Sequence, residues 1–210
     1  MRARLYLVTP PGLVRGDWPL SGFLPLYEAA LAANDVAAVL LRSDAESGDD
    51  AHREAIAALQ PAAHAADAAL ILEYRADLAM ETGCDGIHVR ADEQNVKALR
   101  QALGQDMILG AACGNSKHLA ITAAEAGADY VCFGELDERH SPPDPEAISW
   151  WAEIMEVPCV ALGGIGLEDA EELLQAGSDF LCVGMAVWNH PQGPAAAIAG
   201  FEAAIARHGG

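Results

Sequence analysis

The stretch "VPCVALGGIGLEDAEELLQAGSDFLCVG", residues 157–184, holds two strand patterns with a helix pattern between them. Apolar residues run through 158–162 and again through 179–184, as in strands that are buried on both faces. Between them, leucines and alanines recur at three- and four-residue spacing, and Gly177 stands where the helix would end. Because parallel strands need such a crossover, the stretch predicts a strand–helix–strand unit.

The same unit recurs along the chain. The phrases "METGCDGIHV" (80–89) and "AEAGADYVCFG" (124–134) repeat the glycine at a helix end and the aspartate that opens the next strand. We expect strands at 4–9, 36–42, 68–73, 85–89, 107–111, 129–134, 158–162 and 179–184, with helical segments such as 49–65, 93–103 and 167–177 between them. Eight such units predict an α/β fold, a (β/α)8 TIM barrel that forms a single domain over residues 1–210.

The sixth unit differs from the others in its connection. The polar, proline-rich segment "ELDERHSPPDPEA" (135–147) separates the sixth strand from the helical pattern "ISWWAEIM" (148–155). In a barrel, long loops at the carboxyl ends of strands carry the chemistry. We therefore expect the functional site at this end.

Composition limits the partners. The chain has 31 acidic and 12 basic residues, a formal net charge of -19, which disfavours binding to nucleic acid or to an anionic membrane surface. No apolar run approaches the roughly 20 residues of a membrane span, and the N-terminus lacks a signal-peptide pattern. The five cysteines contain no CxxC pair, so neither a disulfide framework nor a zinc site is expected. We expect a cytoplasmic, enzyme-like domain.

Two consecutive glycines follow the seventh strand. Glycine loses more backbone entropy on folding than other residues, so their presence indicates a structural or functional requirement. Gly163 and Gly164 lie between a strand and a helix start, and Gly184 follows the next strand. The loops after strands seven and eight of TIM barrels commonly bind phosphate through backbone N–H groups. The glycines therefore predict a phosphate cradle, with a simple tight turn as the alternative.

With these motifs in place, the chain resembles the thiamine-phosphate synthase family and its thiazole tautomerase relatives. The resemblance rests on "LYLVTP" (5–10), "DLAMETGCDGIHV" (77–89), "AGADYVCFG" (126–134) and the closing stretch 157–184. It implies a transferase of thiamine biosynthesis that joins the diphosphate ester of an aminomethyl-pyrimidine to a thiazole phosphate and releases pyrophosphate. It also implies small phosphorylated substrates and Mg²⁺ as cofactor. The sequence leaves a homo-oligomer open.

The resemblance assigns the binding of the thiazole phosphate to Gly163, Gly164, Val183, Gly184 and Met185. Met185 stands where the family usually has a serine, so most contacts would come from the backbone.

For the departing pyrophosphate, the resemblance implies cationic side chains, which are Arg42, Arg90 and Arg139 in this sequence. Arg42 is what remains of the family's Gln-x-Arg-x-Lys ending of strand two. Arg139 lies in "RHSPP" (139–143), where the family has Thr-x-Thr-Lys. The alternative for Arg42 is a surface residue that caps the strand end.

The magnesium site that the resemblance implies falls on Asp92 and Glu93, in "HVRADE" (88–93), where the family has "HLGQxD". The alternative is that both acids belong to the first turn of a helix, where the helix dipole favours them. Arg90 stands for the family's glycine and could supply part of the metal's charge.

The substrate pocket would include Glu73, His88 and Cys113. Glu73 and Tyr74 replace the family's Asn-Asp, and for His88 the alternative is a structural, hydrogen-bonded role. Three hypotheses therefore remain open: a synthase, an isomerase of the tautomerase kind that needs no magnesium, and a non-catalytic phosphate-binding protein.

Overall fold

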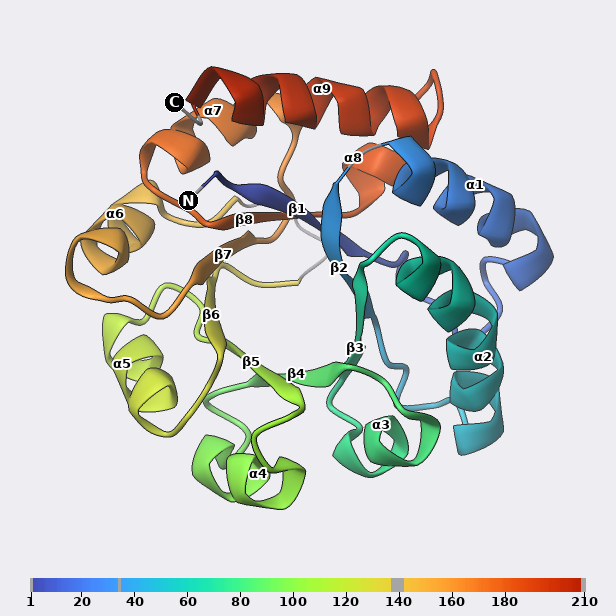
Figure 1. Ribbon diagram of the computed structural model, residues 1–210, viewed down its shortest axis with the longest axis horizontal. Helices are drawn as coiled ribbons and strands as arrows, with labels where there is room; N and C mark the ends of the chain where they lie inside the picture. The colour runs from blue at the N-terminus through green and yellow to red at the C-terminus, as the bar shows by residue number, and fades with distance from the viewer. Residues whose placement is uncertain (1, 34, 137–141, 209–210) are drawn as a thin grey trace.

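The strands close into a barrel. A computed structural model of the chain describes residues 2–33, 35–136 and 142–208. Within these ranges, parallel strands pair in sequence order and the last pairs with the first (Figure 1). The strands are β1 (Arg4–Val8), β2 (Val36–Leu41), β3 (Ala69–Glu73), β4 (Gly86–Arg90), β5 (Ile108–Ala112), β6 (Tyr130–Phe133), β7 (Cys159–Leu162) and β8 (Phe180–Val183). The predicted (β/α)8 barrel is confirmed, and each predicted strand lies within one residue of an observed one.

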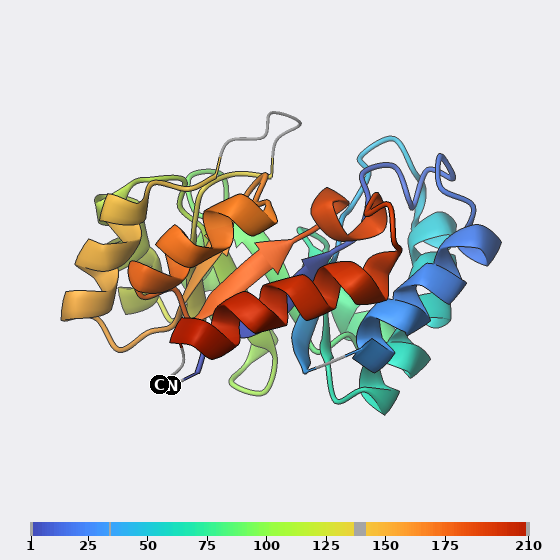
Figure 2. The same ribbon diagram turned by 90° about the horizontal axis from the view of Figure 1, so that it is seen from above.

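Helices surround the barrel and cover the outer face of every strand (Figure 1). They are α1 (Leu20–Ala33), α2 (Asp49–Ala65), α3 (Ala76–Thr82), α4 (Val96–Leu103), α5 (Lys117–Glu125), α6 (Pro145–Ile154), α7 (Leu167–Gln175), the short α8 (Met185–Trp188) and α9 (Pro194–His208). Figure 2 shows α9 running across the outside of the barrel, where it contacts α1 and α7. The last helix therefore covers the seam between β1 and β8.

The repeated glycine–aspartate phrase has a structural reason. Gly83, which caps α3, has the left-handed φ of 71° that glycine tolerates best. The aspartates that follow such turns each accept a hydrogen bond from the backbone N–H near the start of the preceding strand. The pairs are Asp85 with Leu70 N, Asp129 with Leu109 N and Asp179 with Cys159 N, at 2.7 to 2.9 Å. Each carboxylate thus connects the starts of two neighbouring strands.

The core has two layers. Side chains that point outward from the strands pack against the helices, with Phe23, Trp151 and Phe201 among the largest fully buried ones. Inward-pointing side chains fill the barrel interior, and they include Tyr6, Leu40, Ile71, Tyr130, Cys132 and Cys182. The interior is therefore a packed core with a polar pair of tyrosines in it.

Two helix boundaries differ from those expected. The helix expected at 148–155 begins three residues earlier, because Asp144 caps it and Pro145 takes the first position, where its missing N–H costs nothing. Helix α4 begins only at Val96, because the Asn95 side chain accepts a hydrogen bond from Ala98 N. The alternative that placed Asp92 and Glu93 in a first helical turn is therefore wrong, since both lie in the preceding turn.

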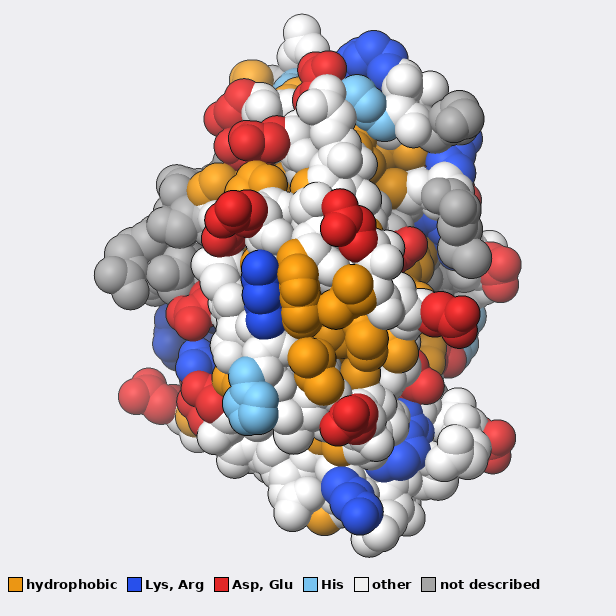
Figure 3. All heavy atoms as spheres, turned by 90° about the vertical axis from the view of Figure 1, so that its left-hand side faces the viewer, with side chains coloured by type: hydrophobic (Ala, Val, Ile, Leu, Met, Phe, Trp, Pro, Cys, Tyr) orange, Lys and Arg blue, Asp and Glu red, His pale blue; other side chains and the backbone are white. Residues whose placement is uncertain are grey.

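The surface on the α5–α6 side carries hydrophobic side chains among acidic and basic ones (Figure 3). Ile154 of α6 is 53% exposed, and the Lys117 ammonium lies 4.9 Å from the ring centroid of Trp150. The homo-oligomer stays a prediction. All five cysteines are buried and unpaired. None of the helices within the described ranges has the length and apolarity required to cross a membrane.

Candidate active site

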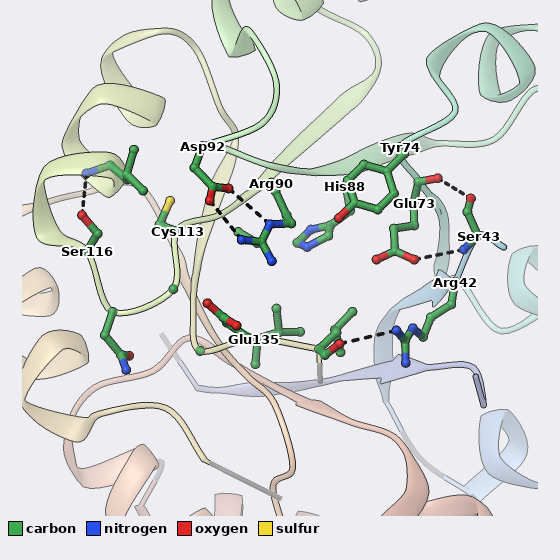
Figure 4. A pocket seen from close by; sticks show the side chains of 17 residues that line it. Arg42, Ser43, Glu73, Tyr74, His88, Arg90, Asp92, Cys113, Ser116 and Glu135 are labelled. Atoms are coloured by element: carbon green, nitrogen blue, oxygen red, sulfur yellow. Dashed lines mark hydrogen bonds and ion pairs between the residues drawn. The ribbon is translucent and has the colours of Figure 1, made fainter. Parts of the chain in front are cut away.

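Two adjoining cavities open at the carboxyl ends of the strands. The first, about 460 Å³, lies beyond β2 to β6 and is lined mainly by polar side chains; we call it the polar cavity (Figure 4). The second, about 880 Å³, lies beyond β7, β8 and β1 and includes Gly163, Gly164 and Gly184; we call it the glycine cavity. Arg42 and Leu136 line both cavities. Two ligands bound in them would therefore meet at Arg42.

Arg42 follows β2 directly, and its guanidinium makes no direct ion pair with an acidic side chain among the described residues, although its charge acts on Glu73 from a greater distance. It donates one long hydrogen bond, 3.4 Å, from a terminal nitrogen to the carbonyl of Leu136 (Figure 4). Its Nε is buried and has no hydrogen-bond partner in the described part of the chain. A buried, unsatisfied donor costs free energy, so this guanidinium is suited to an anionic ligand. The backbone N–H of Arg42 donates a hydrogen bond of 3.1 Å to Thr9 Oγ1.

Arg90 ends β4 and is paired with both acids that follow it. Its guanidinium contacts Asp92 at 3.0 and 3.2 Å and Glu93 Oε1 at 3.1 Å. The hydrogen bond from Arg90 lowers the pKa of Asp92, and the acids raise the pKa of Arg90. Asp92 and Glu93 were the predicted magnesium ligands, and here they surround a guanidinium. The described residues contain no cluster of three or more His, Cys, Asp or Glu side chains able to hold a metal. As they stand, these acids do not form a magnesium site.

Glu73 ends β3 and is nearly buried on the opposite wall of the polar cavity. Its carboxylate accepts a hydrogen bond of 3.0 Å from Ser43 N, and the Ser43 hydroxyl donates to its carbonyl (Figure 4). Burial raises the pKa of Glu73, while Arg42 and the Ser43 N–H oppose that shift. The next residue, Tyr74, has a φ of 63°, an unfavourable conformation for a bulky residue, and its ring lines the cavity.

His88 lies on β4 between these two walls and is 3% exposed. Its Nδ1 is 3.1 Å from the Tyr130 hydroxyl, and that hydroxyl is 2.9 Å from the hydroxyl of Tyr6. Burial lowers the pKa of His88 to about 4, so the imidazole is neutral near pH 7. His88 therefore has a structural, hydrogen-bonded role, and its ring also lines the polar cavity.

Cys113, which follows β5, also lines the polar cavity. It is 2% exposed, and its thiol donates to the carbonyl of Ala111 at 3.4 Å. Burial raises its pKa to about 12, so it stays a thiol and is a poor nucleophile. Arg139, the third predicted cation, lies outside the described residues.

The glycine cavity has backbone donors in its wall. Gly163 has a φ of 116°, and Gly164 and Ile165 make no backbone hydrogen bond to the described residues. Met185 begins α8, so its N–H has no acceptor within the helix. Glu168 and Asp169 of α7 also line this cavity. The Asp169 carboxylate accepts a hydrogen bond of 2.7 Å from the Gly166 N–H, so that donor is not available to a ligand. The available donors therefore come from 163–165 and from the start of α8.

Val183 was predicted to lie at this site, with contacts mainly from the backbone, and its side chain points away from the cavity. It is fully buried among residues that face the helices and is absent from the lining of both cavities, because inward and outward side chains alternate along a strand. Gly184 follows it, and a Cβ there would come within 2.7 Å of Val8 Cγ1. This glycine lets β8 and α8 pack closely against β1.

Sequence reasoning missed Ser43, Tyr130 and Glu135, and it named Tyr74 only as part of the pair that replaces the family's Asn-Asp. Ser43 and Glu135 each lie two residues past the end of a strand, which is a signal for site residues in a barrel. Tyr130 gave no such signal, because it opens β6 and enters the site through the barrel interior.

The eight-stranded barrel with polar side chains at the carboxyl ends of its strands belongs to the class of TIM-barrel enzymes. A family model described as thiamine monophosphate synthase matches residues 5–187. The chain belongs to the thiamine monophosphate synthase family.

Individual relatives agree with this assignment. A thiamine-phosphate synthase from Rhodospirillum centenum is 48% identical, over 95% of this chain and 96% of the relative. One from Hyphomonas neptunium is 42% identical, over 96% and 93%. Among solved structures, a thiamine phosphate pyrophosphorylase from Pyrococcus furiosus superposes with a TM-score of 0.83 at 22% identity and covers 100% of this chain and 98% of that one.

Proposed function

We propose that this chain is a thiamine-phosphate synthase, a transferase that couples a hydroxymethylpyrimidine diphosphate to a thiazole phosphate and releases pyrophosphate. The observation that carries the proposal is Arg42, on the boundary of two cavities, whose guanidinium makes one long hydrogen bond and has a buried Nε without a hydrogen-bond partner among the described residues. A reaction between two phosphorylated substrates needs two anion sites and a cation where they meet. The family membership and the relatives' names support the same reaction.

The diphosphate would occupy the polar cavity, and the thiazole phosphate the glycine cavity. The bond from the pyrimidine methylene carbon to the diphosphate oxygen breaks, and its electron pair leaves with pyrophosphate. The thiazole nitrogen then donates its lone pair to that carbon. Arg42 would balance the charge that develops on the leaving group, with Arg90 on the opposite wall as a second cation.

The backbone donors at Gly164, Ile165 and Met185 would hold the thiazole phosphate and fix its distance from Arg42. No proton has to move in this coupling. A neutral His88 and a protonated Cys113 are compatible with such a reaction.

The magnesium requirement implied by the resemblance stays a prediction. A cation bound at Asp92 and Glu93 would have to displace the Arg90 guanidinium from both. Mg²⁺ is often held by only one or two carboxylates together with substrate phosphates, so such a site would be completed by the diphosphate itself.

The test is an assay of pyrophosphate release and thiamine phosphate formation with both substrates, comparing the wild type with Arg42→Gln. We expect turnover by the wild type and a loss in kcat/KM of about 100-fold in R42Q, the usual size when one charge-stabilising donor is removed. Arg53→Gln is the matched control, because Arg53 pairs with Asp50 and Glu81 on the outer surface.

Two results would contradict the proposal. Proton exchange on a thiazole phosphate carboxylate, without pyrophosphate release, would assign the chain to the tautomerase kind. Binding of phosphorylated ligands with neither reaction would make it a non-catalytic binding protein.

A further inference from the structure

A chain of buried hydrogen bonds runs from the centre of the barrel to the polar cavity. Tyr6 on β1 contacts Tyr130 on β6, hydroxyl to hydroxyl at 2.9 Å, and Tyr130 contacts His88 Nδ1 at 3.1 Å. All three side chains are at most 8% exposed. These hydrogen bonds are therefore largely shielded from solvent.

Gly110 makes the contact between His88 and Tyr130 possible. It lies on β5, paired with His88 on one side and with Tyr130 on the other. A Cβ at this position would come within 2.0 Å of Tyr130 Cζ. Without that Cβ, the two rings stack over the glycine with centroids 5.9 Å apart and planes at 17°. Three adjacent strands, β4, β5 and β6, thus place the glycine between the two rings.

The direction of the hydrogen bonds follows from counting donors and acceptors. The Tyr6 hydroxyl makes no hydrogen bond to any described residue except Tyr130, and the thiols of Cys132 and Cys182 beside it are weak acceptors. Tyr6 must therefore donate to Tyr130, or its proton would be buried without an acceptor. Tyr130 then has its own proton left to donate, and the acceptor within reach is His88 Nδ1.

The direction of these hydrogen bonds determines which nitrogen of the His88 imidazole carries the proton. If Nδ1 accepts a hydrogen bond, a neutral ring carries its proton on Nε2. Nε2 makes no hydrogen bond to a described residue, and it is not among the buried polar atoms that lack one, so it is accessible from the cavity. The ring is visible on the cavity wall between Arg90 and Glu73 (Figure 4).

We propose that Tyr130 is a positioning residue that holds His88 in the Nε2–H tautomer, so that the polar cavity presents a neutral N–H donor to a lone pair of the substrate. The tautomer itself follows from the interior of the barrel alone. Its role toward the pyrimidine substrate rests on the proposed function. The donor would fix the orientation of that substrate, whereas the arginines would hold its charge.

The test is the ¹⁵N NMR spectrum of the histidine rings, which distinguishes protonated from unprotonated ring nitrogens, with His88 assigned through His88→Gln. We expect a protonated Nε2 and an unprotonated Nδ1 in the wild type near pH 7. In Tyr130→Phe the ring stacking stays and the donor to Nδ1 is lost, so the two tautomers should mix. In the matched control Tyr6→Phe, Tyr130 can still donate to Nδ1, so the Nε2–H form should persist.

A proton on Nδ1 in the wild type, an unchanged tautomer in Y130F, or a mixed one in Y6F would each overturn the proposal. In the coupling assay, we expect the KM of the pyrimidine substrate to rise about tenfold in Y130F with a smaller change in kcat, and to stay near the wild-type value in Y6F. If the wild type is inactive but the NMR result holds, the proposed function fails and the tautomer assignment stands.

Discussion

At the residue scale, the site is made of groups whose charge is set by their surroundings. His88 is neutral because burial lowers its pKa to about 4, and Glu73 keeps its proton to higher pH than usual because it is nearly buried. Sequence predicted that Arg42, Glu73, His88 and Arg90 gather at one end of the barrel, since each stands at or near a strand end. The sequence could not predict that Arg90 forms ion pairs with Asp92 and Glu93, because these contacts depend on the conformation of the turn.

The first prediction concerns stability and pH. Between about pH 6.5 and pH 4 the unfolded chain protonates His88 and the folded chain does not, so the free energy of unfolding falls as pH falls through this range. Between about pH 7 and pH 5 this amounts to about 2 kcal/mol. Glu73 has the opposite sign, because its raised pKa favours the folded state as pH falls.

Urea unfolding of the wild type and of His88→Gln at several pH values separates the two contributions. The stability of H88Q should depend less steeply on pH over this range. Equal slopes for the two proteins would show that His88 titrates normally in the folded state.

A second prediction concerns the metal. Arg90→Ala removes the guanidinium that Asp92 and Glu93 share, so the variant should bind Mn²⁺, a spectroscopic substitute for Mg²⁺, about tenfold more tightly than the wild type. The measurement is an EPR titration of free Mn²⁺ without substrates. Arg75→Ala, which removes a partner of Asp49 on α2, controls for the change in net charge. Equal affinities of the wild type and R90A would contradict competition between the arginine and a metal.

At the element scale, the sequence specified strands better than helix starts. Continuous apolar runs and the turn glycines located the strands to within a residue, because buried parallel strands leave little freedom in composition. The start of α4 was missed, because a single side-chain cap at Asn95 decides it. Tyr6 and Tyr130 were missed as partners for a related reason: 124 residues separate them, and only the closed barrel brings them together.

The third prediction tests the aspartate that opens β8. In Asp179→Ala the N–H of Cys159 loses its acceptor at the start of β7, which should reduce the free energy of unfolding by about 1–3 kcal/mol. Asp106→Ala is the control, because Asp106 is exposed in the turn before β5 and should change stability by less than about 0.5 kcal/mol. Equal stabilities of the two variants in urea would show that the repeated aspartate has no structural role.

At the scale of the whole molecule, α9 joins the end of the chain to its beginning. It packs on α1 and α7, buries Ile198, Phe201 and Ile205 completely, and its Glu202 pairs with Arg2 at 2.7 Å. The barrel and its last helix should therefore unfold as one cooperative unit.

Phe201→Ala tests this cooperation. The cavity left behind should cost about 3–5 kcal/mol, with a single urea transition seen by both circular dichroism and tryptophan fluorescence. The exposed Arg207→Ala serves as the control. A separate early transition, or a loss below about 1 kcal/mol, would contradict the view that α9 belongs to the barrel's core.

The central claim is that two phosphorylated substrates occupy two cavities that meet at Arg42. The most direct measurement is a crystal structure of the protein soaked with thiamine phosphate and pyrophosphate. We predict pyrophosphate in the polar cavity within hydrogen-bond distance of Arg42, and the phosphate of thiamine phosphate against the backbone N–H groups of Gly164 and Ile165. Pyrophosphate away from Arg42, or the phosphate ester outside the glycine cavity, would contradict the account.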